Sequence, residues 1–505
     1  MSNYENRIQR DLVTDAVFTE SNEEFILPDY MPEIGRVLRV SAVLLPEAHY
    51  EGSDETEFSG RIEYRLLYGD GEGNITEAPL EGRYRYRVPN GGRASLVTDT
   101  EERIESVNAR PSSPRKLGIR TRIYARPRML AEETLGVSPT SLFGNLPFEA
   151  ITNEAEVLER DSFSSGTLHA EGRFSLENTS PDDVTLISVE AVAAPEGKEA
   201  RDGYLSLRGS LVFTLLLRKG EDLPFVKVCT LPFEEEITAE GARVGDHLFL
   251  RTFVASPTVT FEADGDGTSL LIDTEYSLSG ILSRNQRISF PTDLYAHGVQ
   301  TALGKRSVSL EKLQGTAATC LTVSTDAPLP EEMRAGTLLP RFTLKESCVS
   351  RVGEKAVAEG VLSVLLLSFG ERMAEKCELA LPFRAELPLS SREGEVLSLS
   401  VTPLYGSAQA NGDHVRLSAE ISVSVFSYLP FTISLPISAE RLADAPKADA
   451  STLLLYYPTD SDTLFSVGKK YGVPLSSLKR LNGIPESEES TVPLDGYSYL
   501  FVNEL

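Results

Sequence analysis

Histidine and cysteine side chains come first, because they supply most transition-metal ligands and several kinds of enzyme nucleophile. The chain has five histidines and four cysteines, and they stand singly and far apart: His49, His169, His247, His297, His414, Cys229, Cys320, Cys348 and Cys377. Their spacing fits neither a metal-ligand pair, nor a disulfide framework, nor a zinc knuckle. We therefore expect free thiols in a reducing compartment, no metal site and no cofactor.

One acidic stretch, DGDGTSLLIDTE at 264–275, has oxygen-bearing side chains at the spacing of a calcium loop. Positions 1, 3, 5 and 12 of such a loop would be Asp264, Asp266, Thr268 and Glu275. Ser269 stands where the loop needs a glycine for its sharp turn, and both flanks have the alternation of strands instead of helices. The stretch predicts a hairpin turn, with calcium binding as the alternative.

Motifs of common catalytic and nucleotide-binding sites do not occur in the sequence. GxxxxGKS/T, GxSxG and HExxH are all missing, so phosphate-loop, serine-elbow and zinc-protease chemistries lack their usual carriers. We expect a protein that is not an enzyme. An enzyme with its site in a β-sandwich cleft is the alternative, supported only by the length of the chain.

Length, composition and charge limit the class of protein. A chain of 505 residues predicts three or four domains, and 41% hydrophobic with 25% charged residues is ordinary for globular protein. The net charge of −26 repels phosphate, which disfavours nucleic acid and anionic membranes as partners. The start, MSNYENRIQRDLVTDAVFTE, lacks the apolar segment of a secretory signal, and no apolar run approaches the roughly 20 residues of a membrane span. We expect a cytoplasmic protein.

Three landmarks recur along the chain at intervals of 149 to 151 residues. They are a proline followed by an acidic residue, a glycine that opens a long apolar strand, and a leucine before the next strand: Pro32, Pro181 and Pro330; Gly60, Gly209 and Gly360; Leu80, Leu231 and Leu381. Ordered landmarks at one spacing indicate an internal repeat. The repeats are expected at 1–149, 150–298 and 299–440.

Each repeat has the pattern of β structure. Segments such as RIEYRLLY and HVRLSAEISVSV alternate apolar and polar residues, as a sheet with one face in a core requires. Gly- and Asp-rich stretches at 68–74 and 218–222 stand where hairpins would turn. The fold class predicted is mainly β, with three tandem β-sandwich-like repeats of about 150 residues, each large enough for its own core.

A short linker at 441–450 and a small module at 451–505 are expected after the third repeat. Ser461 or Asp462 can cap a first helix whose apolar face contains Leu464, Val467 and Tyr471, and Gly472 can end it. A second helix would bury Leu475 and Leu478 and stop at the Asn-Gly pair at 482–483. LLLYY and GYSYLFV supply flanking strands, so the order is strand, helix, helix, strand.

The stretch SDTLFSVGKKYGVPLSSLKRLNG resembles the LysM module, whose framework is GDTL, helix, YGV, helix, LN. Ser461 and Gly468 replace the glycine and alanine usual in the family, and PESEES (485–490) replaces its NPD step. Many LysM modules bind N-acetylglucosamine polymers through these edges. The resemblance therefore leaves two kinds of ligand open, a protein partner and peptidoglycan.

The combination of the three repeats with this module resembles SPOCS domains followed by LysM, as in clostridial spore-coat morphogenetic proteins. The elements that carry the resemblance are the PE/PD step, the G…LLY strand and the LPF…E strand. It implies a scaffold in the mother-cell cytoplasm at the forespore surface. Its implied partners are other coat proteins and a coat-morphogenetic ATPase, stage IV sporulation protein A. Free sheet edges also predict self-association of the β repeats.

The partner-binding surface is expected on the LysM-like module. An exposed face is predicted to rest on Leu464, Tyr471 and Leu478 and to consist of Asp462, Thr463, Lys469, Lys470, Lys479 and Asn482. A solvated charged face without a partner is the plainer interpretation of the same residues.

Overall fold

The computed structural model describes residues 4–13, 15–177, 179–265, 267–370, 374–444 and 453–502. Strands make up 73% of it and helices 5%. The prediction of a mainly β fold is thereby confirmed. Every strand pair within the described sheets is antiparallel, and the three-stranded sheets are built from hairpins between consecutive strands.

Unit 1, residues 4–137, forms two sheets. Its strands are β1 (Tyr4–Val13), β2 (Val17–Ile26), β3 (Arg36–Glu51), β4 (Glu55–Gly69), β5 (Ile75–Pro89), β6 (Val97–Ser113) and β7 (Lys116–Val137). One sheet has the order β3-β4-β5. In the other, the long β7 pairs with β6 along one edge and with β2 and then β1 along the opposite edge.

Units 2 and 3 pair their strands in the same order. Unit 2 contains β8 (Phe148–Ser164), β9 (Leu168–Leu176), β10 (Val184–Arg201), β11 (Tyr204–Lys219), β12 (Phe225–Thr238), β13 (His247–Val254), β14 (Thr258–Asp264) and β15 (Gly267–Ala296). Unit 3 contains β16 (Val299–Pro328), β17 (Thr337–Val352), β18 (Lys355–Phe369), β19 (Ala374–Ser390), β20 (Val396–Asn411) and β21 (His414–Asp444). The sheets β10-β11-β12 and β17-β18-β19 correspond to β3-β4-β5. The long β15 and β21 take the place of β7.

Short elements join these strands. The helix α1 (Pro139–Phe143) lies between units 1 and 2. The turns η1 (Pro181–Asp183) and η2 (Glu331–Met333) precede the three-stranded sheets β10-β11-β12 and β17-β18-β19. Asp264 and Gly267 pair across the β14–β15 hairpin, so the calcium-like stretch is flanked by strands; Asp266 lies outside the described residues.

Each unit has an apolar core between its two sheets. In β19 the inward residues Leu381, Phe383, Ala385 and Leu387 are buried, whereas the residues between them are exposed. The same period of two fills the core of unit 1 with Ile62, Tyr64, Leu66 and Tyr68 from β4. Burial of alternate side chains is what holds two sheets face to face.

The glycine landmarks stand where two chain segments approach closely. A Cβ on Gly209 would lie 2.5 Å from the carbonyl oxygen of Ala194 and 2.8 Å from the ring of Phe233. Gly60 faces the Leu45 carbonyl and Tyr84, and Gly360 faces the Glu346 carbonyl and Phe383, at similar distances. In every case the strand paired with the glycine has a bulge beside it.

Gly209→Ala is expected to destabilise unit 2 by about 1–3 kcal/mol, because the new methyl group must displace a backbone carbonyl or an aromatic ring. The measurement is the midpoint of thermal or urea unfolding of the full-length protein. Gly71→Ala is the control, since a Cβ there meets nothing within 4 Å. An equal effect of the two substitutions would contradict this explanation.

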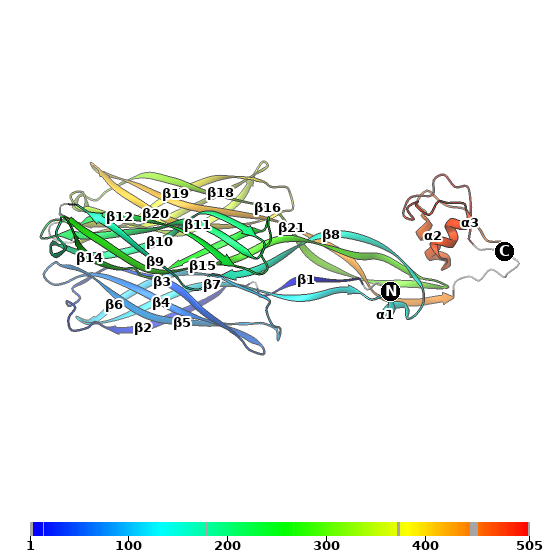
Figure 1. Cartoon of the computed structure of the whole chain (residues 1–505), viewed down its shortest axis with the longest axis horizontal. Helices are drawn as coiled ribbons and strands as arrows, with labels where there is room; N and C mark the ends of the chain where they lie inside the picture. Colours follow the sequence, from blue (N-terminus) through cyan, green and yellow to red (C-terminus); the bar gives the residue numbers. More distant parts are fainter. Residues whose placement is uncertain are drawn as a thin grey trace.

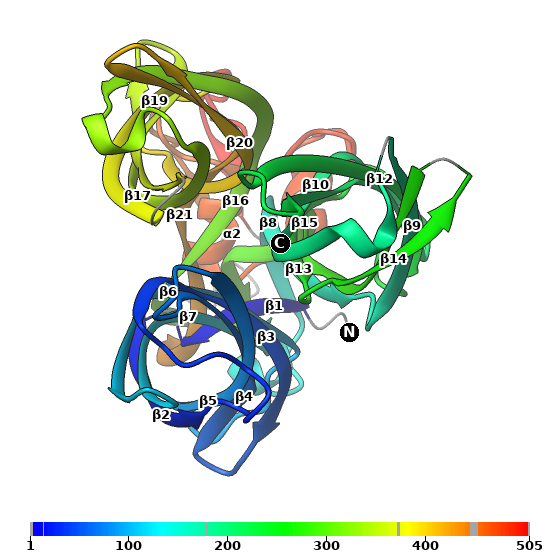
Figure 2. The ribbon, with the colours of Figure 1, turned by 90° about the vertical axis from the view of Figure 1, so that its left-hand side faces the viewer.

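The three units surround a common axis, with their long strands converging on it (Figure 2). On one side of the units these strands continue into a narrow stalk (Figure 1). The stalk consists of β1 with the end of β7, β8 with the end of β15, and β16 with the end of β21. Its core combines residues of all three units: Ile8, Leu135, Val137, Phe143, Val157, Ile288, Phe290, Leu294, Ala296, Val299, Val308, Leu310, Ile433 and Leu435.

The sequence predicted a boundary at 440, but β21 continues to Asp444, which pairs with Val299 of β16. Residues 441–444 of the expected linker are therefore strand, because β16 offers them a partner. The remainder of that linker lies outside the described residues.

Candidate functional site

The C-terminal module, residues 453–502, consists of β22 (Leu455–Tyr456), α2 (Leu464–Tyr471), α3 (Leu475–Leu481) and β23 (Leu500–Phe501). The two short strands pair with each other. A small core lies between them and the helices: Leu464, Val467, Leu478, Ile484, Leu494, Leu500 and Val502.

Thr463 caps α2 instead of Ser461 or Asp462. Its hydroxyl accepts a hydrogen bond from the Ser466 backbone N–H at 3.1 Å, and Ser466 Oγ accepts one from the Thr463 N–H at 2.9 Å. Asp462 organises the preceding turn, where it accepts bonds from the Thr459 backbone N–H at 2.8 Å and the Tyr456 hydroxyl at 2.7 Å. These bonds hold the pKa of Asp462 below its usual value. Gly472 ends the helix in the left-handed conformation, at φ 65°.

Two residues of the predicted exposed face have internal roles. Lys479 is only 7% exposed, and its Nζ donates to the carbonyl oxygens of Glu486 at 2.9 Å and Glu488 at 2.6 Å. The prediction of an exposed Lys479 is wrong, because the acidic loop at 485–490 folds back over the side chain. Asn482 donates to Leu478 O and Phe501 O and accepts from the Phe501 N–H, so it ties α3 to β23.

The two neighbouring lysines of α2 have different surroundings. Lys469 is half-buried and forms an ion pair with Asp293 of β15, with 2.5 Å between Nζ and Oδ1. Lys470 is exposed, with its Nζ 4.8 Å from the centre of the Tyr456 ring and 5.6 Å from that of Tyr471. Of the six residues expected on one surface, Lys470 is exposed, Asp462 and Thr463 are half-buried, and Lys469 faces the stalk.

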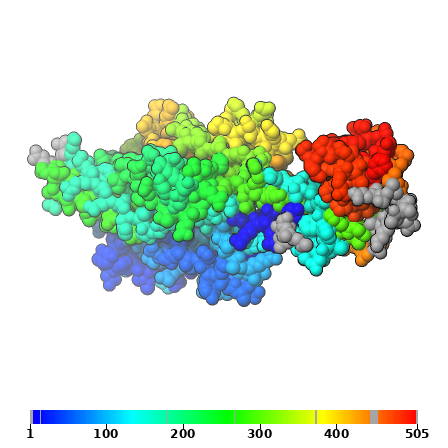
Figure 3. All heavy atoms as spheres, turned by 45° about the vertical axis from the view of Figure 1, so that its right-hand side comes forward, coloured from blue at the N-terminus to red at the C-terminus, as the bar shows by residue number. Residues whose placement is uncertain are grey.

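The module packs against the end of the stalk (Figure 3). The Tyr295 hydroxyl donates to Val473 O at 2.7 Å, the Gly298 N–H donates to Gly472 O at 2.8 Å, and Gln300 Nε2 donates to Lys470 O at 2.8 Å. The rings of Tyr295 and Phe465 meet edge to face at 5.1 Å. These contacts fix the module on the β body.

The contact with Tyr295 also explains an unusual residue in α2. A Cβ on Gly468 would lie 2.4 Å from the Tyr295 hydroxyl oxygen. An alanine there would prevent the present docking unless the ring moved. Gly468 therefore fits the module to the stalk.

Comparisons with protein-family models, curated proteins and solved structures found no match to the chain. On the module, the large apolar side chains that remain exposed are Leu453, Leu455, Tyr457, Val492 and Tyr499.

Apart from the C-terminal module, a cluster of charged residues lies where the three units meet. Arg39 of β3 is 3% exposed, and it pairs with Glu77 of β5 at 3.5 Å and with Glu190 of β10 at 3.0 Å. Arg65 of β4 also pairs with Glu77, at 3.3 Å, and Arg341 of β17 pairs with Glu190 at 3.0 Å. The network, here called the junction cluster, connects all three units through charged side chains that are largely withdrawn from water.

The sequence interpretation missed this cluster, although it carries a signal. Charged residues recur at an interval of 151 positions, as Arg39, Glu190 and Arg341. Each of them interrupts an otherwise apolar strand. A charge in such a strand needs a partner when both faces are buried.

Burial raises the pKa of Glu77 to about 7, against the opposing attraction of Arg39 and Arg65. A carboxyl whose pKa is raised on folding stabilises the protein fully below about pH 4.5, and this contribution is lost as pH rises to about 7. Relative to Glu77→Gln, the wild-type protein is therefore expected to lose roughly 3 kcal/mol of stability over that range. Urea unfolding of both proteins from pH 4.5 to 8 measures the difference. A constant difference across that range would contradict the assignment.

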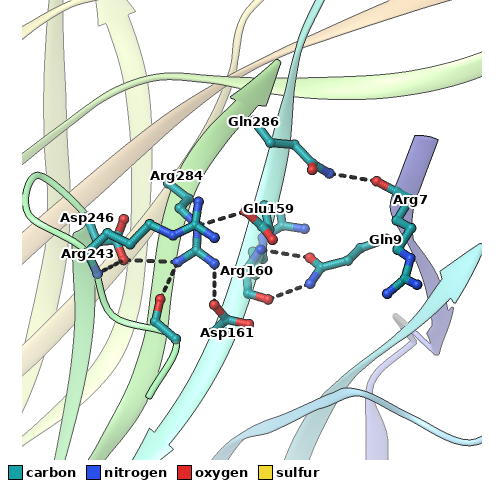
Figure 4. Close-up of polar contacts among 10 residues, drawn as sticks. Arg7, Gln9, Glu159, Arg160, Asp161, Arg243, Asp246, Arg284 and Gln286 are labelled. Carbon is teal, nitrogen blue, oxygen red and sulfur yellow. Dashed lines mark hydrogen bonds and ion pairs between the residues drawn. The ribbon is translucent and has the colours of Figure 1, made fainter. Parts of the chain in front are cut away.

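Further polar contacts hold units 1 and 2 together nearer the stalk (Figure 4). Gln9 of β1 exchanges two hydrogen bonds with the backbone of Arg160 in β8, at 2.5 and 2.7 Å, and Gln286 donates to Arg7 O at 2.8 Å. Within unit 2, Arg284 binds three carboxylates: Glu159 and Asp161 of β8, and Asp246 of the loop before β13. Such contacts fix the orientation of neighbouring units.

Two other kinds of site are absent from the described part of the chain. It holds no group of three or more His, Cys, Asp or Glu residues that could bind a metal ion. Among its helices, none has the length and apolar character needed to cross a membrane.

Proposed function

We propose that this protein is a non-enzymatic scaffold of spore-coat assembly. In this proposal the three units are copies of one SPOCS-like unit, and the C-terminal module is a LysM-type module. The module binds a coat-morphogenetic ATPase, stage IV sporulation protein A, at the forespore surface in the mother-cell cytoplasm. The β units bind other coat proteins or a second copy of the chain.

The observation that best supports a scaffold is the docking of a strand-helix-helix-strand module on a body built from three interlocked units. Tyr295, Gly298 and Gln300 of the stalk hold the module through backbone carbonyls of 470–473. A module held in this way presents its remaining surface in a constant direction. That arrangement suits a protein that positions one partner relative to others.

The acidic loop at 485–490 supports a protein partner over a glycan. It lies where LysM modules have their NPD step, and its backbone is held over Lys479. Glu486 and Glu489 are exposed there. Exposed carboxylates attract a basic protein surface and offer nothing specific to a neutral sugar polymer.

Lys470→Glu is expected to weaken partner binding by no more than about fivefold, because an exposed charge on the rim of an interface contributes about 1 kcal/mol or less. Titration of the full-length protein with the ATPase and, separately, with chitooligosaccharide measures the effect. Lys376→Glu is the control, since this lysine lies on β19, far from the module in sequence and on another unit.

Tight binding of chitooligosaccharide without affinity for the ATPase would favour the alternative, a peptidoglycan-binding protein of the spore cortex or cell wall. A fluorescent fusion imaged during sporulation gives an independent test. A shell around the forespore supports the scaffold, and diffuse fluorescence in vegetative cells contradicts it.

A further inference from the structure

A cavity of about 200 Å³ lies beside the junction cluster and is lined from all three units. Unit 1 contributes Ser41 and Arg65, which are paired across β3 and β4 and so share one face of their sheet. Unit 2 contributes Glu190 and Thr214, paired in the same way across β10 and β11. Arg341 enters from β17 of unit 3. The cavity is thus formed by the assembly and by no single unit.

The charges around this cavity do not balance. Arg39, Arg65 and Arg341 are three guanidinium groups, and they share two carboxylates, Glu77 and Glu190. At least one positive charge remains when both carboxylates are ionised. With its pKa raised to about 7, Glu77 is partly protonated at neutral pH, which increases the positive excess.

Hydrogen-bond donors are also left over. Arg39 Nε and Nη2 are buried without a hydrogen-bond partner among the described residues, since the 3.5 Å approach of Nη2 to Glu77 is an ion pair without hydrogen-bond geometry. Arg39 lies behind the cavity and does not line it, and the lining Arg65 already donates to Ser256 Oγ, Glu77 and Pro257 O. Arg341 uses one of its donors, toward Glu190, and therefore has the most donors left for a ligand in the cavity. Uncompensated charge and unpaired donors in a largely buried site are costly unless an anion or water satisfies them.

The lining suits an anion better than a cation or an apolar ligand. Glu190 is the carboxylate that borders the cavity, and two guanidinium groups already bind it. The lining also includes Arg65, Arg341 and the hydroxyl residues Ser41, Thr214, Ser256 and Tyr405. Ser41 Oγ donates to Arg65 O, Ser256 Oγ accepts from Arg65 Nε, and the Tyr405 hydroxyl bonds to Glu420. A guanidinium matches the geometry of phosphate and carboxylate oxygens, and hydroxyl groups can donate to the same oxygens.

We propose that the junction of the three units binds one small oxyanion, a phosphate or a carboxylate, in this cavity. The anion neutralises the surplus guanidinium charge and links Arg341 of unit 3 to Arg65 of unit 1 and Thr214 of unit 2. Its binding stabilises the arrangement of the units around their axis. The volume leaves room for the anion with a few water molecules, since water occupies about 30 Å³ per molecule in the liquid.

The test uses the full-length protein, titrated with inorganic phosphate and separately with acetate at constant ionic strength. Calorimetry and the thermal midpoint are both measured. Saturable binding should appear with at least one anion and should raise the midpoint by about 2–5 °C at saturation. A response to phosphate alone identifies a phosphate site, and a response to acetate alone identifies a carboxylate site. No saturable response to either anion overturns the proposal.

Arg341→Gln is expected to weaken anion binding at least tenfold. Arg208→Gln is the matched control, because Arg208 is an exposed arginine of β11 that pairs with Glu234 and does not line the cavity. Unchanged binding in Arg341→Gln overturns the proposal. If that variant does not fold, Thr214→Val removes a lining hydroxyl without removing a charge and is expected to weaken binding about threefold; unchanged binding there has the same consequence.

Discussion

Replacement of Arg39 by methionine is expected to destabilise the assembly of the three units by about 1–3 kcal/mol, because it removes the buried guanidinium that joins Glu77 of unit 1 to Glu190 of unit 2 and leaves each carboxylate with a single arginine, Arg65 or Arg341. Glu77 and Glu190 belong to units 1 and 2, and both depend on this guanidinium. Methionine keeps much of the volume of the side chain, so the loss is mainly electrostatic. Unfolding in urea, followed by fluorescence and by circular dichroism, measures it.

Arg120→Met is the matched control. Arg120 is 65% exposed in its side chain and pairs with Glu20 on the surface of unit 1. A surface ion pair contributes about 0–1 kcal/mol. If both substitutions lower the stability equally, the network does not join the units. If Glu77→Met added to Arg39→Met restores much of the loss, the cost lies in the buried Glu77 carboxylate, which then has Arg65 alone as its partner.

The strands within each unit follow from local sequence patterns, and the packing between units does not. Alternation along β4 and β19 predicts strands with one buried face. However, Leu67, Leu216 and Leu367 belong to the opposite faces of β4, β11 and β18, and they are buried against one another at the common axis. Their strands end in runs of consecutive leucines, which is typical of strands buried on both faces. The leucine runs predict that both faces of these strands are buried, but they do not identify which segment of the chain covers the second face.

In the C-terminal module, too, local sequence predicts the elements but not the contacts that distant segments make with them. Its order of elements, its helix end at Gly472 and its apolar positions all come from short-range spacing, and the structure places them accordingly. Lys479 and Lys469 could not be placed from spacing, because a loop seven to nine residues later covers one and Asp293 of the stalk pairs with the other. A charged residue at a helical position is exposed only if no distant segment reaches it.

Tyr295→Ala is expected to release the module from the stalk. Tyr295 is fully buried, its hydroxyl donates to Val473 O at 2.7 Å, and its ring packs edge to face against Phe465. Burial also raises the pKa of its hydroxyl, so it stays protonated and able to donate. Loss of a buried aromatic side chain costs about 3–5 kcal/mol. The other polar contacts are hydrogen bonds made by Gly298 and Gln300, a bond from the Leu475 N–H to Glu149 Oε1 at 3.3 Å, and the Lys469–Asp293 ion pair; each contributes about 1 kcal/mol.

The release is measured by energy transfer between one dye on the module and another on unit 3, and by the rate of protease cleavage between residues 444 and 453. Tyr457→Ala is the control, because Tyr457 belongs to the module but is 67% exposed. In Tyr295→Ala the transfer should fall and cleavage should accelerate, while the module keeps its own fold, since Tyr295 is not part of its core. Unchanged transfer and cleavage in Tyr295→Ala would mean that the module is held by other contacts. Affinity for the ATPase should then be compared between the two variants: a scaffold that positions its partner keeps the binding in Tyr295→Ala and loses the fixed orientation.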